Sequence, residues 1–167
     1  MAPKRPNGAG AFPRPVESIA PSRPDPNALY AALDLGTKTI GVAVSDLRRM
    51  VATPLETVKR QKFTLDAARL LEIAKGRQLS GFILGLPLNM DGSEGPRCQS
   101  TRAFARNLAG LTDLPIGFWD ERLSTVAAER ALLAFDTSRA KRAEVIDHVA
   151  AGFILQGFLD RLSAMRR

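Results

Sequence analysis

Three acidic residues of this chain stand in or beside apolar segments, where a carboxylate is costly to bury. Asp34 comes at the end of the apolar run 29–33, and Gly36 follows it and suits a tight turn. Burial disfavours the charged form of such an acid unless a partner compensates for the lost hydration. Asp34 could therefore hold a metal ion or a phosphate-bound metal. It could equally well accept hydrogen bonds from the amides of the turn.

Glu121 and Asp147 are the other two acids. Asp120 and Glu121 directly follow an apolar run that we interpret as a strand, and the residues three, four and seven positions after Asp147 are all apolar. An acid stabilised by the dipole at the start of a helix is the alternative explanation for Asp147. Three carboxylates from three elements form the oxygen ligand set that Mg²⁺ or Mn²⁺ prefers. Two such ions can stabilise the attacking water and the leaving oxygen of a phosphodiester.

The elements that must position these acids follow one another in a regular order. Two strands joined by a tight polar turn are expected within residues 29–46, and further strands over 51–58, 81–86 and 114–119. Helices are expected over residues 64–75, 97–108, 124–135 and 141–162, the first of them capped by Thr64 and stopped at Gly76. Pro54 predicts an edge strand or a bulge. We therefore expect an α/β fold with a mixed five-stranded sheet flanked by helices, whose sites lie beyond the carboxyl ends of strands.

Composition places these elements in one domain. Residues 1–28 are rich in proline and basic residues, which predicts a disordered tail. The folded domain is expected over 29–162, followed by a short C-terminal tail at 163–167. No apolar run has the length of about 18 residues that a membrane span needs, and no signal peptide is evident. With one cysteine in 167 residues, the chain is predicted to be cytoplasmic, without membrane association.

The net charge of +7 indicates a polyanionic partner, with nucleic acid as the first candidate. Basic residues near the acidic motifs are expected to contact the phosphate backbone. The candidates are Lys38, Arg97, Arg122, Arg139, Lys141 and Arg142.

Four motifs carry a resemblance to a known family. They are the segments 34–46 (DLGTKTIGVAVSD), 85–92 (GLPLNMDG), 120–125 (DERLST) and 146–151 (IDHVAA). In this order they resemble the YqgF family, bacterial proteins described as Holliday junction resolvases or pre-rRNA nucleases. The resemblance implies a ribonuclease H-like fold and hydrolysis of nucleic-acid phosphodiester bonds. Processing of the 5′ end of pre-16S rRNA in ribosome biogenesis is the implied role.

The resemblance also implies roles for single residues. Asp34, Glu121 and Asp147 would be the catalytic residues and the ligands of Mg²⁺ or Mn²⁺. Asp120 would orient Arg122 or act as a further ligand, and Asp91 could join the site from its loop. Thr39 stands where many members of the family have arginine, which puts a phosphate contact from that position in doubt.

Three functions are alternatives to the pre-rRNA nuclease. A sugar kinase or actin-like ATPase also begins with a strand, an aspartate and a Gly-Thr turn, but it needs a second glycine-rich phosphate turn that this sequence lacks. The two remaining alternatives are a Holliday junction resolvase acting on structured DNA and a non-catalytic rRNA-binding protein. Junction resolution needs two active sites and favours a homodimer, whereas a monomer favours RNA trimming.

Overall fold

A mixed five-stranded sheet forms the centre of the molecule, as the sequence predicts. The structure is a computed structural model that describes residues 28–123 and 139–165, the side chains of 139–148 excepted. The strands are β1 Tyr30–Leu35, β2 Thr39–Ser45, β3 Ala52–Lys59, β4 Gly81–Leu86 and β5 Ile116–Asp120. Their order in the sheet is β3-β2-β1-β4-β5. The pairs β1–β2 and β2–β3 are antiparallel, and β1–β4 and β4–β5 are parallel.

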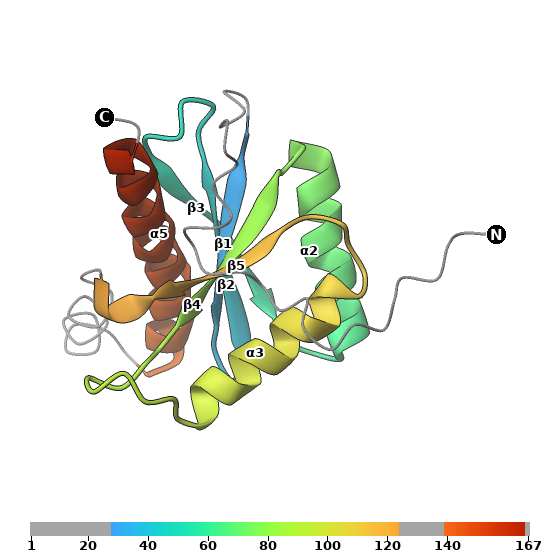
Figure 1. The fold of residues 1–167 in the computed structure, drawn as a ribbon. Coiled ribbons are helices and arrows are strands. Elements are labelled where there is room, and N and C mark those ends of the chain that lie inside the picture. The colour runs from blue at the N-terminus through green and yellow to red at the C-terminus, as the bar shows by residue number, and fades with distance from the viewer. Residues whose placement is uncertain (1–27, 124–138, 166–167) are drawn as a thin grey trace.

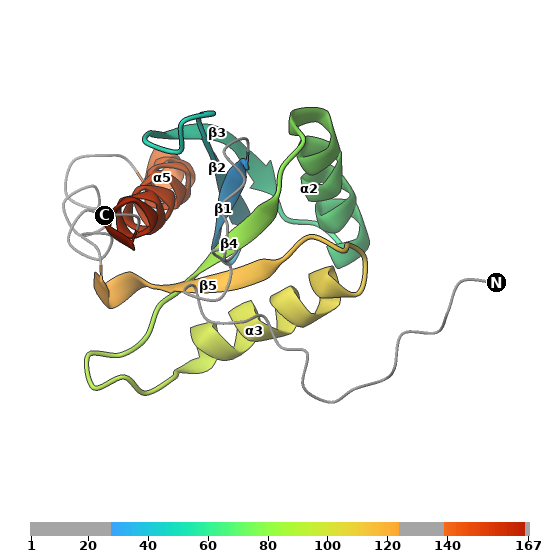
Figure 2. The ribbon, with the colours of Figure 1, turned by 45° about the horizontal axis from the view of Figure 1, so that its top comes forward.

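Helices cover both faces of this sheet (Figure 1). They are α2 Phe63–Arg77, α3 Pro96–Ala109 and α5 Arg139–Met165, and a 3-10 turn, η1, spans Glu121–Leu123. Figure 2 shows α5 on one face and α2 with α3 on the other. Successive side chains of β1 point to opposite faces of the sheet and contribute to both cores. Ala31 and Leu33 pack on the side of α2 and α3, and Tyr30 and Ala32 pack beneath α5.

The edge strand β3 contains the predicted irregularity. Val42 pairs with Glu56 and Ala43 pairs with Pro54, so the register shifts by one residue between these two pairs. Proline has no backbone N–H to donate to a ladder, and it is therefore tolerated at a bulge in an edge strand. The prediction made from Pro54 is confirmed.

The ends of α2 differ from the prediction. The helix begins at Phe63 after Lys62, without a side-chain cap from Thr64, and it continues through Gly76 to Arg77. Gln78 then adopts a left-handed conformation with φ of 53°, and the Leu79 N–H donates to the carbonyl of residue 74 at 2.9 Å. Leu79 is buried, and burial of the residue after the turn commonly fixes this kind of helix end. Packing of Leu79, rather than the glycine, therefore decides where α2 stops.

Other boundaries also move. Helix α3 begins at Pro96 and α5 extends over Arg139–Met165, longer than the predicted 141–162, whereas β5 begins at Ile116. The buried Ala28 packs with the core beneath α5. Residue 28 was predicted to end the tail at 1–28; the rest of that tail and the predicted helix at 124–135 lie outside the described residues.

Close packing between α5 and β5 depends on Gly157. A Cβ at this position would lie 2.8 Å from Cζ2 and 3.0 Å from Cε2 of Trp119, a ring that is 3% exposed. We expect Gly157→Ala to lower the free energy of unfolding by about 1–3 kcal/mol, because overpacking outweighs the gain in helix propensity. Urea unfolding measures the change. Gly76→Ala is the control, since nothing lies within 4 Å of the added methyl, and it should stabilise by about 0.5–1 kcal/mol. Equal free energies of unfolding for wild type and Gly157→Ala would contradict the close contact between Gly157 and the Trp119 ring.

Candidate active site

Asp34 lies near the carboxyl end of β1, and its side chain is almost fully buried, with 2% exposed. The turn that follows is closed by the Gly36 N–H, which donates to the Thr39 carbonyl at 2.9 Å. Arg60, directly after β3, holds this turn, because its Nη1 donates to the Gly36 carbonyl at 2.7 Å and its N–H to the Lys38 carbonyl at 2.9 Å. The backbone just after Asp34 is thus fixed by a hydrogen bond within the turn and by two from Arg60.

Glu121 begins the η1 turn directly after β5, and it is 6% exposed. Its carboxylate lies over Gly85 of β4, since a Cβ built on this glycine would be 2.6 Å from Glu121 Oε1. The same Cβ would also collide with Cδ1 of Ile154, from α5. Glu121 and Ile154 therefore occupy the space that the absence of a side chain at Gly85 leaves open.

Asp34 borders the same glycine from the other side. Leu33 of β1 pairs with Leu84 of β4, and the next position along the parallel register sets Asp34 beside Gly85, at a strand spacing of about 4.8 Å. Because side chains alternate along a strand, Asp34 faces the same side of the sheet as Ala32, which packs beneath α5. The structure therefore brings two predicted acids together, from β1 and from the end of β5.

Asp147 is carried by α5. It precedes Ile154 by two helical turns and shares its face of the helix, roughly 10 Å nearer the start of α5. In Figure 1 the start of α5 lies at the end of the molecule where β1 and β4 end. The side chain of Asp147 is not among those described, so its place in the site stays a prediction.

Asp120 and Arg122 form an ion pair beside Glu121. The Arg122 Nε donates to both carboxylate oxygens of Asp120 at 3.1 Å, and Nη2 donates to Oδ2 at 2.7 Å. The Arg122 backbone N–H donates to Oδ1 of the same carboxylate at 2.9 Å. These bonds from Arg122 lower the pKa of Asp120 below its ordinary value and raise that of Arg122. Asp120 thus holds the Arg122 guanidinium, and its role in the site stays a prediction.

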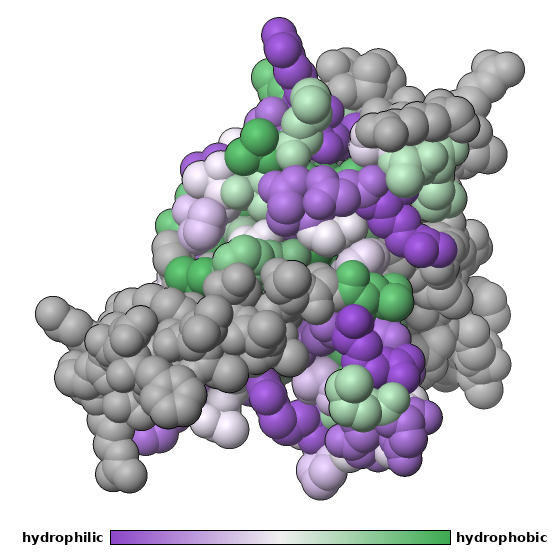
Figure 3. All heavy atoms as spheres, turned by 90° about the vertical axis from the view of Figure 1, so that its left-hand side faces the viewer, coloured by the Kyte–Doolittle hydropathy of each residue, from purple (hydrophilic) through white to green (hydrophobic). Residues whose placement is uncertain are grey.

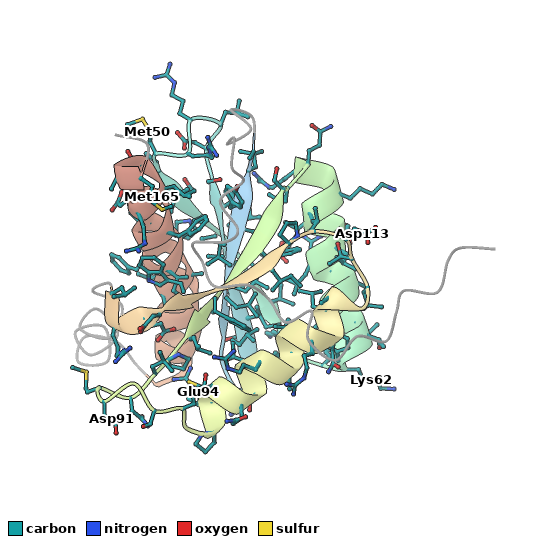
Figure 4. All side chains as sticks on the ribbon, in the orientation of Figure 1. Met50, Lys62, Asp91, Glu94, Asp113 and Met165 are labelled. Atoms are coloured by element: carbon teal, nitrogen blue, oxygen red, sulfur yellow. The ribbon has the colours of Figure 1, made fainter. Side chains whose placement is uncertain are left out.

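The loop between β4 and α3 contains the acids at 91 and 94, labelled in Figure 4. Asp91 accepts hydrogen bonds from the N–H and hydroxyl of Ser93 at 2.8 and 2.5 Å, and these bonds lower its pKa. Glu94 accepts from Nε of Arg102 at 2.6 Å and forms an ion pair with the same guanidinium. Both acids thus have partners within the loop and α3.

The predicted phosphate contacts are only partly described. Lys38 and Arg97 are exposed, in the β1–β2 turn and in the first turn of α3. Arg139, Lys141 and Arg142 lie in the first turns of α5, and their side chains are outside the described set. Figure 3 shows a mixed surface on the α5 side, mainly hydrophilic at its lower end. Within the described residues, none of the helices could cross a membrane.

Two features of the site are not evident from motifs. The first is Gly85, which leaves room for the Glu121 carboxylate. A glycine inside an otherwise apolar strand often marks a place where another group approaches the backbone closely, and the sequence contains this signal. Arg60 braces the turn after Asp34 through contacts that depend on the packing of β3. The sequence gives no direct signal for that contact.

The donor chemistry of this site fits a hard divalent cation. Asp34 is buried near the end of β1 and Glu121 is buried over Gly85, and a divalent cation would compensate two such carboxylates for their loss of hydration. Oxygen ligands of this kind select Mg²⁺ or Mn²⁺. Among the residues whose side chains are described, no group of three potential ligands is complete. The third carboxylate would come from Asp147.

The sheet order, the covering helices and the acids at strand ends define a ribonuclease H-like fold. A solved structure of Thermus thermophilus RuvC bound to a Holliday junction superimposes with a TM-score of 0.52 at 15% identity, covering 81% of this chain and 96% of that one. The chain belongs to the RuvX family, described as "Holliday junction resolvase", which matches residues 28–161. This result confirms the family predicted from the motifs.

Curated relatives are similar over most of their length. A protein of Ruegeria sp. (strain TM1040) is 71% identical over 150 residues, which cover 90% of this chain and 95% of the relative. A protein of Roseobacter denitrificans is 75% identical over 136 residues, covering 80% and 83%. Both are described as "Putative pre-16S rRNA nuclease". Family and fold together identify this chain as a nuclease, a hydrolase of phosphodiester bonds.

Proposed function

We propose that this protein is a metal-dependent nuclease that processes the 5′ end of pre-16S rRNA. The observation that carries the proposal is the pair of buried carboxylates at strand ends, Asp34 near the end of β1 and Glu121 directly after β5 and over Gly85. The descriptions of its relatives support the choice of RNA substrate.

Each group has a distinct role in this proposal. Asp34, Glu121 and Asp147 would hold Mg²⁺ or Mn²⁺, which when bound stabilises the negative charge that develops on the phosphate. Phosphates of the substrate would be oriented by basic residues at the same end of the molecule: Lys38, Arg97, Arg139, Lys141 and Arg142. Such contacts position the nucleic-acid backbone without reading its sequence. Arg60 keeps the turn after Asp34 in place.

The proposal is tested with three labelled substrates: a pre-16S rRNA 5′ end, an unstructured single-stranded RNA and a four-way DNA junction. Each is incubated with the full chain in Mg²⁺, Mn²⁺ or a chelator. We expect metal-dependent cleavage with preference for the rRNA precursor. Preference for the junction, together with a stable dimer in light scattering, would replace the proposal by junction resolution. Binding of rRNA without cleavage in either metal would indicate a non-catalytic RNA-binding protein.

A further inference from the structure

The guanidinium of Arg122 contacts two separate segments. Nε and Nη2 are bonded to the Asp120 carboxylate, and Nη1 donates to the carbonyl of Met90 at 3.3 Å. Met90 lies in the loop after β4, and its side chain is 89% exposed. The guanidinium also lies near Gly92 of this loop, since a Cβ built there would be 3.4 Å from Nη1. All three nitrogens of this side chain therefore have a partner or neighbour in the protein.

The segment that Arg122 contacts has its own internal order. The Asn89 N–H donates to the Ser93 carbonyl at 3.0 Å, and the Gly92 N–H returns to the Asn89 carbonyl at 2.8 Å. Gly92 has φ of +87°, a conformation that glycine adopts without strain. Residues 89–93 thus form a small closed turn, which we name the 89–93 turn. Arg122, in η1, contacts this turn through the hydrogen bond from its Nη1 to the Met90 carbonyl.

We infer that Arg122 is a positioning residue that fastens the 89–93 turn to the residue beside it, Glu121. The planar fork of arginine suits this role, because two edges of one rigid group face Asp120 and Met90 at fixed angles. Glu121 is adjacent to Arg122 in the chain and lies over Gly85 at the end of β4. Arg122 therefore links the 89–93 turn, which follows β4, to Glu121, which follows β5, and fixes the position of each relative to the other.

This role differs from a direct phosphate contact, the function predicted for Arg122 from sequence. A phosphate would have to compete with the Asp120 carboxylate, which already has four hydrogen bonds from Arg122. The two roles also differ in salt dependence. Each phosphate contact contributes about 0.7 to the slope of log affinity against log salt for single-stranded RNA, and a positioning contact contributes nothing.

The test uses the full chain with Arg122→Lys and Arg122→Gln, and Arg77→Gln as the charge-matched control. Arg77 is exposed at the C-terminal end of α2, shortly before the start of β4. Amide hydrogen exchange of Asn89 and Gly92 reports on the turn. Binding of a labelled single-stranded RNA in chelator, across a salt series, gives the slope. Thermal unfolding midpoints confirm that each variant is folded.

We expect both Arg122 variants to exchange these amides about fivefold faster, with the lysine variant no better than the glutamine variant. The salt slope should stay within error of wild type. On a cleaved substrate, kcat should fall about tenfold to a hundredfold with little change in KM, because Glu121 is displaced slightly. Arg77→Gln should match wild type in every measurement.

A different pattern would overturn the inference. Unchanged exchange with a slope reduced by about 0.7 in Arg122→Gln would make Arg122 a phosphate contact. Full rescue of exchange and kcat by lysine would show that charge alone is needed. The kinetic part of this inference rests on the proposed function. If the wild type cleaves nothing, the exchange of the 89–93 turn still decides whether Arg122 fastens it.

Discussion

Cleavage should disappear in the Asp34→Asn variant while nucleic-acid binding persists or becomes tighter. Asparagine keeps the shape of the side chain in a position that is 2% exposed, so the strand and its turn should fold unchanged. The substitution removes the negative charge that a divalent cation needs and that repels phosphate. We expect a loss of at least about a thousandfold in kcat, typical of removing an electrostatic group at the reacting centre. A cleavage assay in Mg²⁺ and in Mn²⁺, beside fluorescence anisotropy with labelled RNA, measures both effects.

Asp66→Asn is the matched control for this experiment. Asp66 is also buried, at 3% exposed, but it lies in α2 and accepts a hydrogen bond from the Gln61 N–H at 3.0 Å. Its amide counterpart can still accept that bond through the carbonyl oxygen. Asp66→Asn should therefore cleave as wild type does. Undiminished cleavage by Asp34→Asn would exclude the metal site, and equal losses in both variants would point to general destabilisation.

The sequence predicts β1, β2, β4 and β5 well because each contains a short run of mainly apolar residues. The mixed sheet, the irregularity at Pro54 and the placement of two acids at strand ends could all be derived from such local patterns. The end of α2 could not, because it depends on the burial of Leu79, which is a property of tertiary packing. Helix propensity at Gly76 is a weaker effect, about 1 kcal/mol.

The candidate site was predictable as residue types and less so as a geometry. Asp34 and Glu121 follow from strand ends, but their meeting over Gly85 depends on the parallel register of β1 with β4. The loop acid Asp91 has the same residue type, yet its oxygen is bonded to Ser93. Sequence spacing does not distinguish a carboxylate that closes a turn from one that faces another carboxylate. Burial makes that distinction, because Asp91 is exposed and Asp34 is buried.

Gly85→Ala should separate the architecture of the site from its chemistry. The added methyl would lie 2.6 Å from Glu121 Oε1 and would also collide with Ile154. Both are ends of flexible side chains, so we expect the fold to survive at a cost of about 1–3 kcal/mol. Glu121 must leave its place over Gly85, and a displacement near 1 Å can reduce kcat about a hundredfold.

Gly157→Ala is the comparison that makes the result of Gly85→Ala specific. It overpacks the same layer beneath α5, but the ring of Trp119 is what the methyl meets, not a carboxylate. Both variants should lose similar stability in urea unfolding, and only Gly85→Ala should lose cleavage when assayed at a temperature where both are folded. Because Asp34 and the basic residues are unchanged, its RNA binding should remain close to wild type. Wild-type kcat in Gly85→Ala would mean that the position of Glu121 over β4 is not required for the reaction, and it would remove the observation on which the proposed nuclease site rests.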